Sequence, residues 1–239
     1  MMKNFTHLAS ALAEMGGLAE AQLAMALGAL PRFDADLAQE AISADLAIDA
    51  QHQKVIEACL ALLPNAGDLS GIDQRGILAA HKIALHLERI GDYSRNIAER
   101  TIILSQRQEM VPLPALRRLG TLVQQGLHQI LNALARREMG LALQAWHADM
   151  VVDELYSSLF RESLRWMEGD QHMITSQVHA LFIARSLERI GDHSSNIAEA
   201  LHFWLTGNPW AEQRRNYDDT SKTLDPLATG LESMLRKAS

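Results

Sequence analysis

The chain has 239 residues, with 22 Lys and Arg against 29 Asp and Glu, which gives a formal net charge of −7. Nucleic-acid-binding proteins carry basic surfaces, so this acidic balance argues against nucleic acid as a partner. The single cysteine, Cys59, excludes an internal disulfide and a Cys-rich zinc site, and favours a reducing, cytoplasmic compartment. No apolar run reaches about 18 residues, so we expect no segment that spans a membrane.

Prolines divide the chain into long segments that have the composition of helices. A proline inside a helix costs about 3 kcal/mol, so Pro31, Pro64, Pro112, Pro114 and Pro209 mark the breaks between helices. Alternating strand patterns are scarce, and we therefore expect an all-α protein. In chain order, the predicted helices cover residues 4–30, 34–63, 73–106, 115–137, 139–168 and 171–206, followed by a polar tail with one short helix at 224–237.

The sequence contains an internal duplication. LERIGDYSRNIAE, which starts at Leu87, and LERIGDHSSNIAE, which starts at Leu187, agree at eleven of thirteen positions, 100 residues apart. The earlier helices repeat at an offset of 104, as in residues 23–30 against 127–134. We therefore predict two tandem three-helix bundles, residues 1–108 and 109–207, related by a pseudo-two-fold axis, with a polar C-terminal tail at 208–239.

Each predicted bundle carries two pairs of acidic residues at i, i+4 spacing, one pair on its second helix and one on its third. Such pairs lie on one helix face, where like charges cost roughly 0.2–0.5 kcal/mol per pair. A helical projection places the third-helix pairs opposite the apolar stripe, so we expect them at the outer surface of each bundle. The four pairs are Asp45/Asp49, Glu88/Asp92, Asp149/Asp153 and Glu188/Asp192.

These acids have two interpretations. Carboxylates on adjacent helices supply the oxygen ligands that suit Mg²⁺, Mn²⁺, Ca²⁺ or iron. Alternatively, the acids only solvate an outer face, with Arg95 and Arg185 placed to pair with them. The repetition of the pairs in both halves favours a cation site. Gly91 and Gly191 lie inside the motif, where close helix packing is the favoured explanation and a local kink the alternative. No phosphate-binding Gly-rich loop is present, and no catalytic machinery is visible, so we expect no enzyme.

The doubled LERIGD segment, with its ExxxD pairs and the following NIAE, resembles the PhoU family of phosphate-transport accessory and regulatory proteins. The resemblance covers residues 5–207 and includes MGGLAEAQL at 15–23. It implies two three-helix bundles whose acidic motifs bind metal ions, with iron, zinc, manganese and magnesium as the candidates. The metal ligands that it implies are Asp45, Asp49, Glu88, Asp92, Asp149, Asp153, Glu188 and Asp192.

The resemblance also implies a function without catalysis. It predicts a cytoplasmic adaptor that negatively regulates phosphate uptake and the phosphate-starvation two-component response. The implied partners are the phosphate ABC transporter, through its ATPase subunit, and a sensor histidine kinase, with membrane contact only through these proteins and with a homodimer or higher homo-oligomer as the assembly. Two alternatives stay open: a metal-storage protein or metal-dependent enzyme that uses the carboxylates, and a purely structural helical interaction module.

Overall fold

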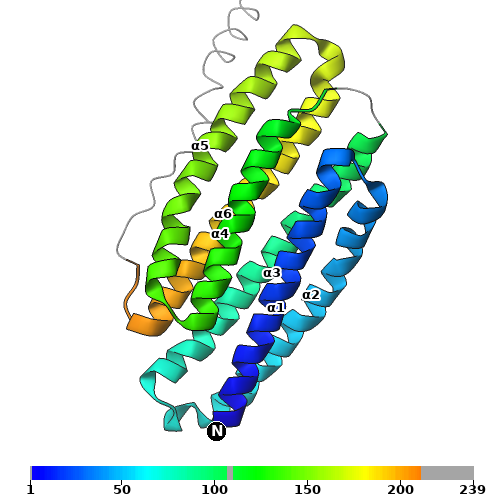
Figure 1. The fold of residues 1–239 in the computed structure, drawn as a ribbon. Helices are drawn as coiled ribbons and strands as arrows, with labels where there is room; N and C mark the ends of the chain where they lie inside the picture. The colour runs from blue at the N-terminus through cyan, green and yellow to red at the C-terminus, as the bar shows by residue number, and fades with distance from the viewer. Residues whose placement is uncertain (1, 107–109, 211–239) are drawn as a thin grey trace, which may run out of the picture.

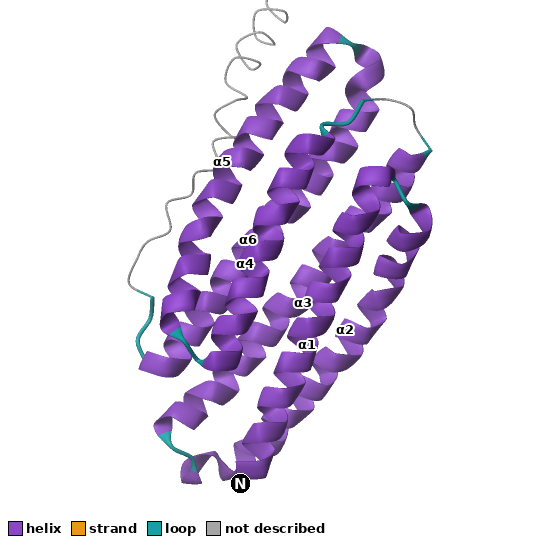
Figure 2. Cartoon of the chain, in the orientation of Figure 1, coloured by secondary structure: helices purple, strands orange, loops and turns teal. Residues whose placement is uncertain are grey.

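The computed structural model describes residues 2–106 and 110–210, which form six long helices (Figure 1, Figure 2). No strand occurs within these ranges, and the all-α prediction is confirmed. The predicted short helix at 224–237 lies outside the described residues. The long helices are α1 (Met2–Ala29), α2 (Ala35–Leu62), α3 (Gly71–Ser105), α4 (Leu113–Arg136), α5 (Met139–Gly169) and α6 (Ile174–Thr206), with short 3-10 turns at Leu30–Arg32, Leu63–Asp68 and Gln171–Met173.

Caps and left-handed residues set the ends of several helices. The Asp34 carboxylate accepts a hydrogen bond of 3.0 Å from the backbone N–H of Leu37, which caps α2. Ser70 caps α3 in the same way. Arg137, at φ 54°, turns the chain between α4 and α5, and Gly207, at φ 77°, ends α6. Because the connections are short, consecutive helices run antiparallel (Figure 1).

Helices α1–α3 pack on one another to form the first bundle, and α4–α6 form the second. The predicted pair of three-helix bundles is therefore confirmed. Helices α2 and α5 lie at opposite outer edges, and α3 packs against α6 to join the bundles (Figure 1). The cores are aliphatic, and their largest fully buried side chains include Leu23, Ile48, Ile83, Leu87, Ile97, Leu119 and Leu127. None of the described helices is long and apolar enough to cross a membrane.

A second contact between the bundles, α1 against α4, follows the duplication. The side chain of Leu131 lies over Gly16, where a Cβ would be 2.7 Å from it, and Leu27 lies over Gly120, where a Cβ would be 2.6 Å away. Gly16 and Gly120 are equivalent at the offset of 104, and so are Leu27 and Leu131. The two reciprocal glycine–leucine contacts therefore place a pseudo-two-fold axis between α1 and α4.

Candidate metal centres

Gly91 and Gly191 allow the second helix of each bundle to approach the third. A Cβ at Gly91 would lie 3.0 Å from Ile48 and 3.4 Å from the Asp45 Oδ1 atom. A Cβ at Gly191 would overlap the Asp149 Oδ1 atom. Helices α3 and α6 continue without a break through these glycines, so the close-packing interpretation is confirmed. The absent side chains bring the aspartates of α2 and α5 against the ExxxD motifs.

In the second bundle, three acids from α5 and α6 come together. Carboxylate oxygens of Asp153, Glu188 and Asp192 all lie within 4.8 Å of one another, and we call these residues the second cluster. Asp153 is 1% exposed and Glu188 is 3% exposed. The predicted outer-surface position is therefore wrong for Glu188. The physical reason is that α5 packs along this side of α6, and that Arg185 and Arg189 lie against the carboxylate.

The environment of the second cluster favours a proton or a cation at neutral pH. Burial, together with the charges of Asp192 and Asp153, raises the pKa of Glu188 to about 7, although Arg185 and Arg189 oppose the shift. Arg185 donates a hydrogen bond of 3.2 Å to Glu188, and Arg189 donates one of 3.0 Å to Asp192. These contacts compensate part of the negative charge that the three acids concentrate.

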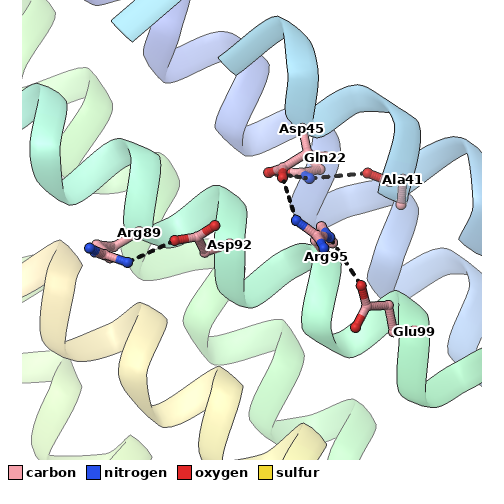
Figure 3. Close-up of polar contacts among 7 residues, drawn as sticks. All are labelled: Gln22, Ala41, Asp45, Arg89, Asp92, Arg95 and Glu99. Atoms are coloured by element: carbon pink, nitrogen blue, oxygen red, sulfur yellow. Dashed lines mark hydrogen bonds and ion pairs between the residues drawn. The ribbon is translucent and has the colours of Figure 1, made fainter. Parts of the chain in front are cut away.

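In the first bundle, Asp45 is held by nitrogen donors from two other helices (Figure 3). The amide nitrogen of Gln22 on α1 donates to the Ala41 carbonyl at 3.0 Å and to the Asp45 Oδ1 atom at 3.3 Å. The Arg95 guanidinium on α3 donates to the Asp45 Oδ2 atom at 3.3 Å and to Glu99 at 3.0 Å. Both carboxylate oxygens of Asp45 therefore accept hydrogen bonds within the protein.

The remaining acids of the first bundle are more exposed than their counterparts. The side chains of Glu88 and Asp92 are 23% and 35% exposed, and Asp49 is exposed. Burial raises the pKa of both Glu88 and Asp92, and neighbouring carboxylates add to this. Arg89 opposes the shift, at 3.5 Å from Glu88 and at 3.0 Å from Asp92 (Figure 3). We call Asp45, Asp49, Glu88 and Asp92 the first cluster. Among the described residues, only the second cluster brings three acidic, His or Cys ligands within 4.8 Å.

Sequence reasoning missed a histidine pair between the bundles. The Nδ1 atoms of His86 on α3 and His193 on α6 lie 3.0 Å apart, and Tyr93 stacks on the His193 ring. Burial and the neighbouring His86 lower the pKa of His193 to about 4, so one neutral imidazole can donate to the other at pH 7. His86 and His193 occupy different positions in the repeat, so the search for repeated motifs could not find this contact.

Comparisons with known proteins agree with the doubled architecture. The family model described as "PhoU domain" matches residues 12–101 and again residues 116–201. The chain belongs to the PhoU family. A relative from Caulobacter vibrioides, named phosphate-specific transport system accessory protein PhoU homolog, is 38% identical over 221 residues, which are 92% of this chain and 96% of the relative. The Escherichia coli K12 protein, named phosphate-specific transport system accessory protein PhoU, is 34% identical over 197 residues, 81% of this chain and 80% of that protein.

Crystal structures of two PhoU proteins share the fold. PhoU from Pseudomonas aeruginosa has a TM-score of 0.83 and 34% sequence identity, over 86% of this chain and 99% of that one. The phosphate transport system regulatory protein PhoU from Streptococcus pneumoniae has a TM-score of 0.79 and 25% identity, over 87% and 98% of the two chains. The doubled bundle of this PhoU protein is therefore the fold of the family.

The residues of the second cluster fit a metal ion. The donors are carboxylate oxygens, which hard cations such as Mg²⁺ and Mn²⁺ prefer. The donors come from two helices that Gly191 holds in close contact. The first cluster fits less well, because Gln22 and Arg95 already contact the oxygens of Asp45. That all eight acids act as ligands remains a prediction.

Proposed function

We propose that this PhoU protein is a non-enzymatic regulator of phosphate transport. The observation that carries the proposal is the match of the PhoU domain to both halves of the chain, together with relatives over most of its length that are named phosphate transport accessory proteins. The test is a deletion strain in which phosphate uptake and a phosphate-starvation reporter are measured. Constitutive reporter expression in phosphate-rich medium is expected, and unchanged uptake and expression would overturn the proposal.

We further propose that the protein acts as a cytoplasmic adaptor between the transporter ATPase and the sensor histidine kinase. Its surface supports a docking role, since large apolar side chains are exposed on neighbouring helices: Leu46 on α2 is 75% exposed, and Leu78 on α3 and Phe182 on α6 are 58% and 51% exposed. Co-purification of the ATPase and the kinase with the tagged protein from phosphate-rich cells is the expected result. Recovery of neither partner would contradict the adaptor role.

The same exposed side chains support self-association into a homodimer or a higher oligomer. Isolated apolar residues are common on protein surfaces, but contact between copies would remove these side chains from water, at about 25 cal/mol per Å² buried. Light scattering during size-exclusion chromatography measures the mass directly. A mass close to the 26.5 kDa of one chain at all concentrations would exclude the oligomer.

We also propose that the carboxylate clusters bind iron, zinc, manganese or magnesium ions. Support comes from the approach of three acids in the second cluster and from the burial of Glu188, whose charged form a nearby cation would stabilise. Metal analysis of the purified protein, compared with the Asp153→Asn/Glu188→Gln double variant, tests the proposal. Equal metal content in the two proteins would contradict it. Turnover that disappears with the metal would instead indicate a metal-dependent enzyme.

A further inference from the structure

Two hollows lie along the groove between α1 and α4, which run side by side (Figure 1). One hollow, of about 650 Å³, is lined within residues 24–31 and 113–124, and we call it the Arg117 hollow. The other, of about 460 Å³, is lined within residues 6–20 and 128–137 and by Trp204, and we call it the His128 hollow. Every residue that lines the Arg117 hollow has its counterpart, at the offset of 104, in the lining of the His128 hollow. The duplication therefore gives the chain two equivalent hollows, and their differences show what each can bind.

A polar bridge crosses the His128 hollow. The Nδ1 atom of His128 on α4 donates a hydrogen bond of 2.7 Å to the Glu20 carboxylate on α1, and the amide nitrogen of Asn132 donates one of 2.9 Å to Nε2 of the same ring. The Arg137 guanidinium lies 4.9 Å from the centre of the Trp204 ring. The charged groups that line this hollow therefore already have partners within the protein.

The Arg117 hollow has no such bridge. Ala24 stands where the other hollow has His128, and its methyl group cannot form a hydrogen bond to Gln124, the counterpart of Glu20. Arg117 is the counterpart of Ala13; its side chain is exposed, and its guanidinium pairs with no described residue. The rest of the lining is mostly apolar: Ala24, Leu27, Leu30, Pro31, Leu113 and Pro114. This hollow is therefore open, apolar over most of its lining, and positively charged at Arg117.

The helix that carries Arg117 is positively charged in an acidic protein. Residues 113–137 contain Arg117, Arg118, Arg136 and Arg137 and no Asp or Glu, whereas the whole chain has a formal net charge of −7. All four arginines are exposed. A guanidinium beside an apolar surface can form a charge-assisted hydrogen bond to a carboxylate while the apolar groups next to it leave water. The occupant that fits is therefore apolar on one side and acidic at its edge.

The shape of the Arg117 hollow fits a helix. Its lining on α4 runs from Leu113 to Gln124, which is about three turns, or roughly 17 Å, of helix. A helix laid between α1 and α4 would pack on both, as the third helix of each bundle packs on the other two. Amphipathic helices bind grooves of this kind through apolar side chains at i, i+3, i+4 and i+7. A flat bilayer surface could not fill a hollow, and a small inorganic anion would leave the apolar lining in water.

We propose that the Arg117 hollow binds an amphipathic helix of a partner protein, whose apolar side chains fill the hollow and whose acidic edge pairs with Arg117. This inference rests on the adaptor role proposed above and assigns a surface to one of the two partners. The hollow lies on α1 and α4, whereas the exposed Leu46, Leu78 and Phe182 lie on α2, α3 and α6. The two surfaces use different helices, so the second partner has a surface of its own.

The first test measures how much transporter ATPase and how much sensor kinase co-purify with the tagged full chain from phosphate-rich cells, by quantitative mass spectrometry. Arg117→Glu is expected to lower the recovery of one of the two partners at least tenfold, and Arg117→Lys, which keeps the positive charge, is expected to retain most of it. Arg136→Glu is the matched control, because it reverses the charge of an exposed arginine on the same helix that lines neither hollow. This control is expected to recover both partners at the wild-type level.

The second test closes the Arg117 hollow with residues from the chain's own second hollow. Ala24→His combined with Gln124→Glu introduces the pair that forms the bridge between His128 and Glu20, and it is expected to lower the recovery of the same partner at least tenfold. Ala21→His combined with Gln125→Glu makes the same changes at exposed positions of α1 and α4 that line neither hollow, and it is expected to have no effect. Circular dichroism melting of each variant shows that the compared proteins are folded.

The possible failures can be told apart. Wild-type recovery of both partners by Arg117→Glu would overturn the inference while leaving the adaptor role intact. Equal losses in Arg117→Glu and Arg136→Glu would overturn the assignment to the hollow, since they would show a general effect of charge. Recovery of neither partner by the wild type would overturn the adaptor role and the inference together. Flotation with phosphatidylglycerol vesicles that is lost in Arg117→Glu, with partner recovery unchanged, would overturn the partner helix in favour of a lipid surface.

Discussion

The substitution Glu188→Gln tests the electrostatics of the second cluster in the metal-free protein. The folded protein holds the pKa of Glu188 at about 7, against an ordinary value of 4.5, chiefly because the carboxylate is buried. Each pH unit of this difference corresponds to 1.36 kcal/mol, so keeping the carboxylate charged in the fold costs about 3 kcal/mol. Glutamine has the shape of the protonated acid and cannot ionise.

The sign of the pH dependence follows from proton binding. Between pH 4.5 and 7, the folded state binds more protons at Glu188 than the unfolded state does, so this residue lowers the stability of the fold as pH rises. At pH 8, Glu188→Gln should therefore raise the free energy of unfolding by up to about 3 kcal/mol, and at pH 5 by about 1 kcal/mol or less. Other titrating groups cancel when variant and wild type are compared at the same pH.

Urea unfolding followed by circular dichroism, at pH 5 and pH 8 in the presence of EDTA, measures these values. Glu88→Gln is the matched control in the first bundle. Its effect should be smaller, because the Glu88 side chain is 23% exposed, against 3% for Glu188. A lower free energy of unfolding for Glu188→Gln than for the wild type at pH 8 would refute the reasoning. It would mean that Arg185 and Arg189 stabilise the charged form of Glu188 more than burial destabilises it.

Three further predictions concern other parts of the structure. Gly191→Ala should destabilise the protein by about 1–3 kcal/mol in thermal melting, because the new Cβ overlaps Asp149, whereas Gly17→Ala, with nothing within 4 Å, should not, and equal effects would contradict the close packing. Between pH 7 and pH 5, His193 should lower the free energy of unfolding of the wild type by about 2 kcal/mol, because the lowered pKa keeps its imidazole neutral in the fold while the unfolded chain takes up a proton there. His193→Gln should lack this loss of stability, and a pH profile equal to that of the wild type would contradict the assignment. Leu46→Glu, at a side chain 75% exposed, should change the free energy of unfolding by less than about 0.5 kcal/mol but weaken recovery of the transporter ATPase in pull-downs. Full recovery would exclude Leu46 from the docking surface.

Exposure of the acidic pairs shows where sequence reasoning succeeded and where it failed. The helical projection placed Glu88 and Glu188 alike, because the motif around them is nearly identical. The structure leaves the Glu88 side chain 23% exposed and the Glu188 side chain 3% exposed. A projection describes one helix, whereas the exposure of a side chain depends on its neighbours. Leu85 in the first half corresponds to Arg185 in the second, and Arg185, unlike Leu85, forms a salt bridge with the carboxylate of its own half.

The difference between the two clusters was present in the sequence but could not be interpreted there. Arg95 and Ser195 stand out as one of two mismatches in the repeated motif. Their importance depends on Gln22, which is 23 residues from Asp45 along the chain and reaches it only because α1 packs against α2. A contact between helices at such separation leaves no periodic pattern in the sequence.

The sequence by itself determined the helical class, the duplication, the family and the residues from which a metal site could be built. Helix periodicity, proline positions and a repeated motif are local properties, and each can be read along a single chain. Only the tertiary structure decided which acids are buried, which meet within 4.8 Å and which are already paired. The reason is physical: desolvation and charge pairing act through space between α1, α2, α3, α5 and α6, so equal motifs acquire different electrostatics when their neighbours differ.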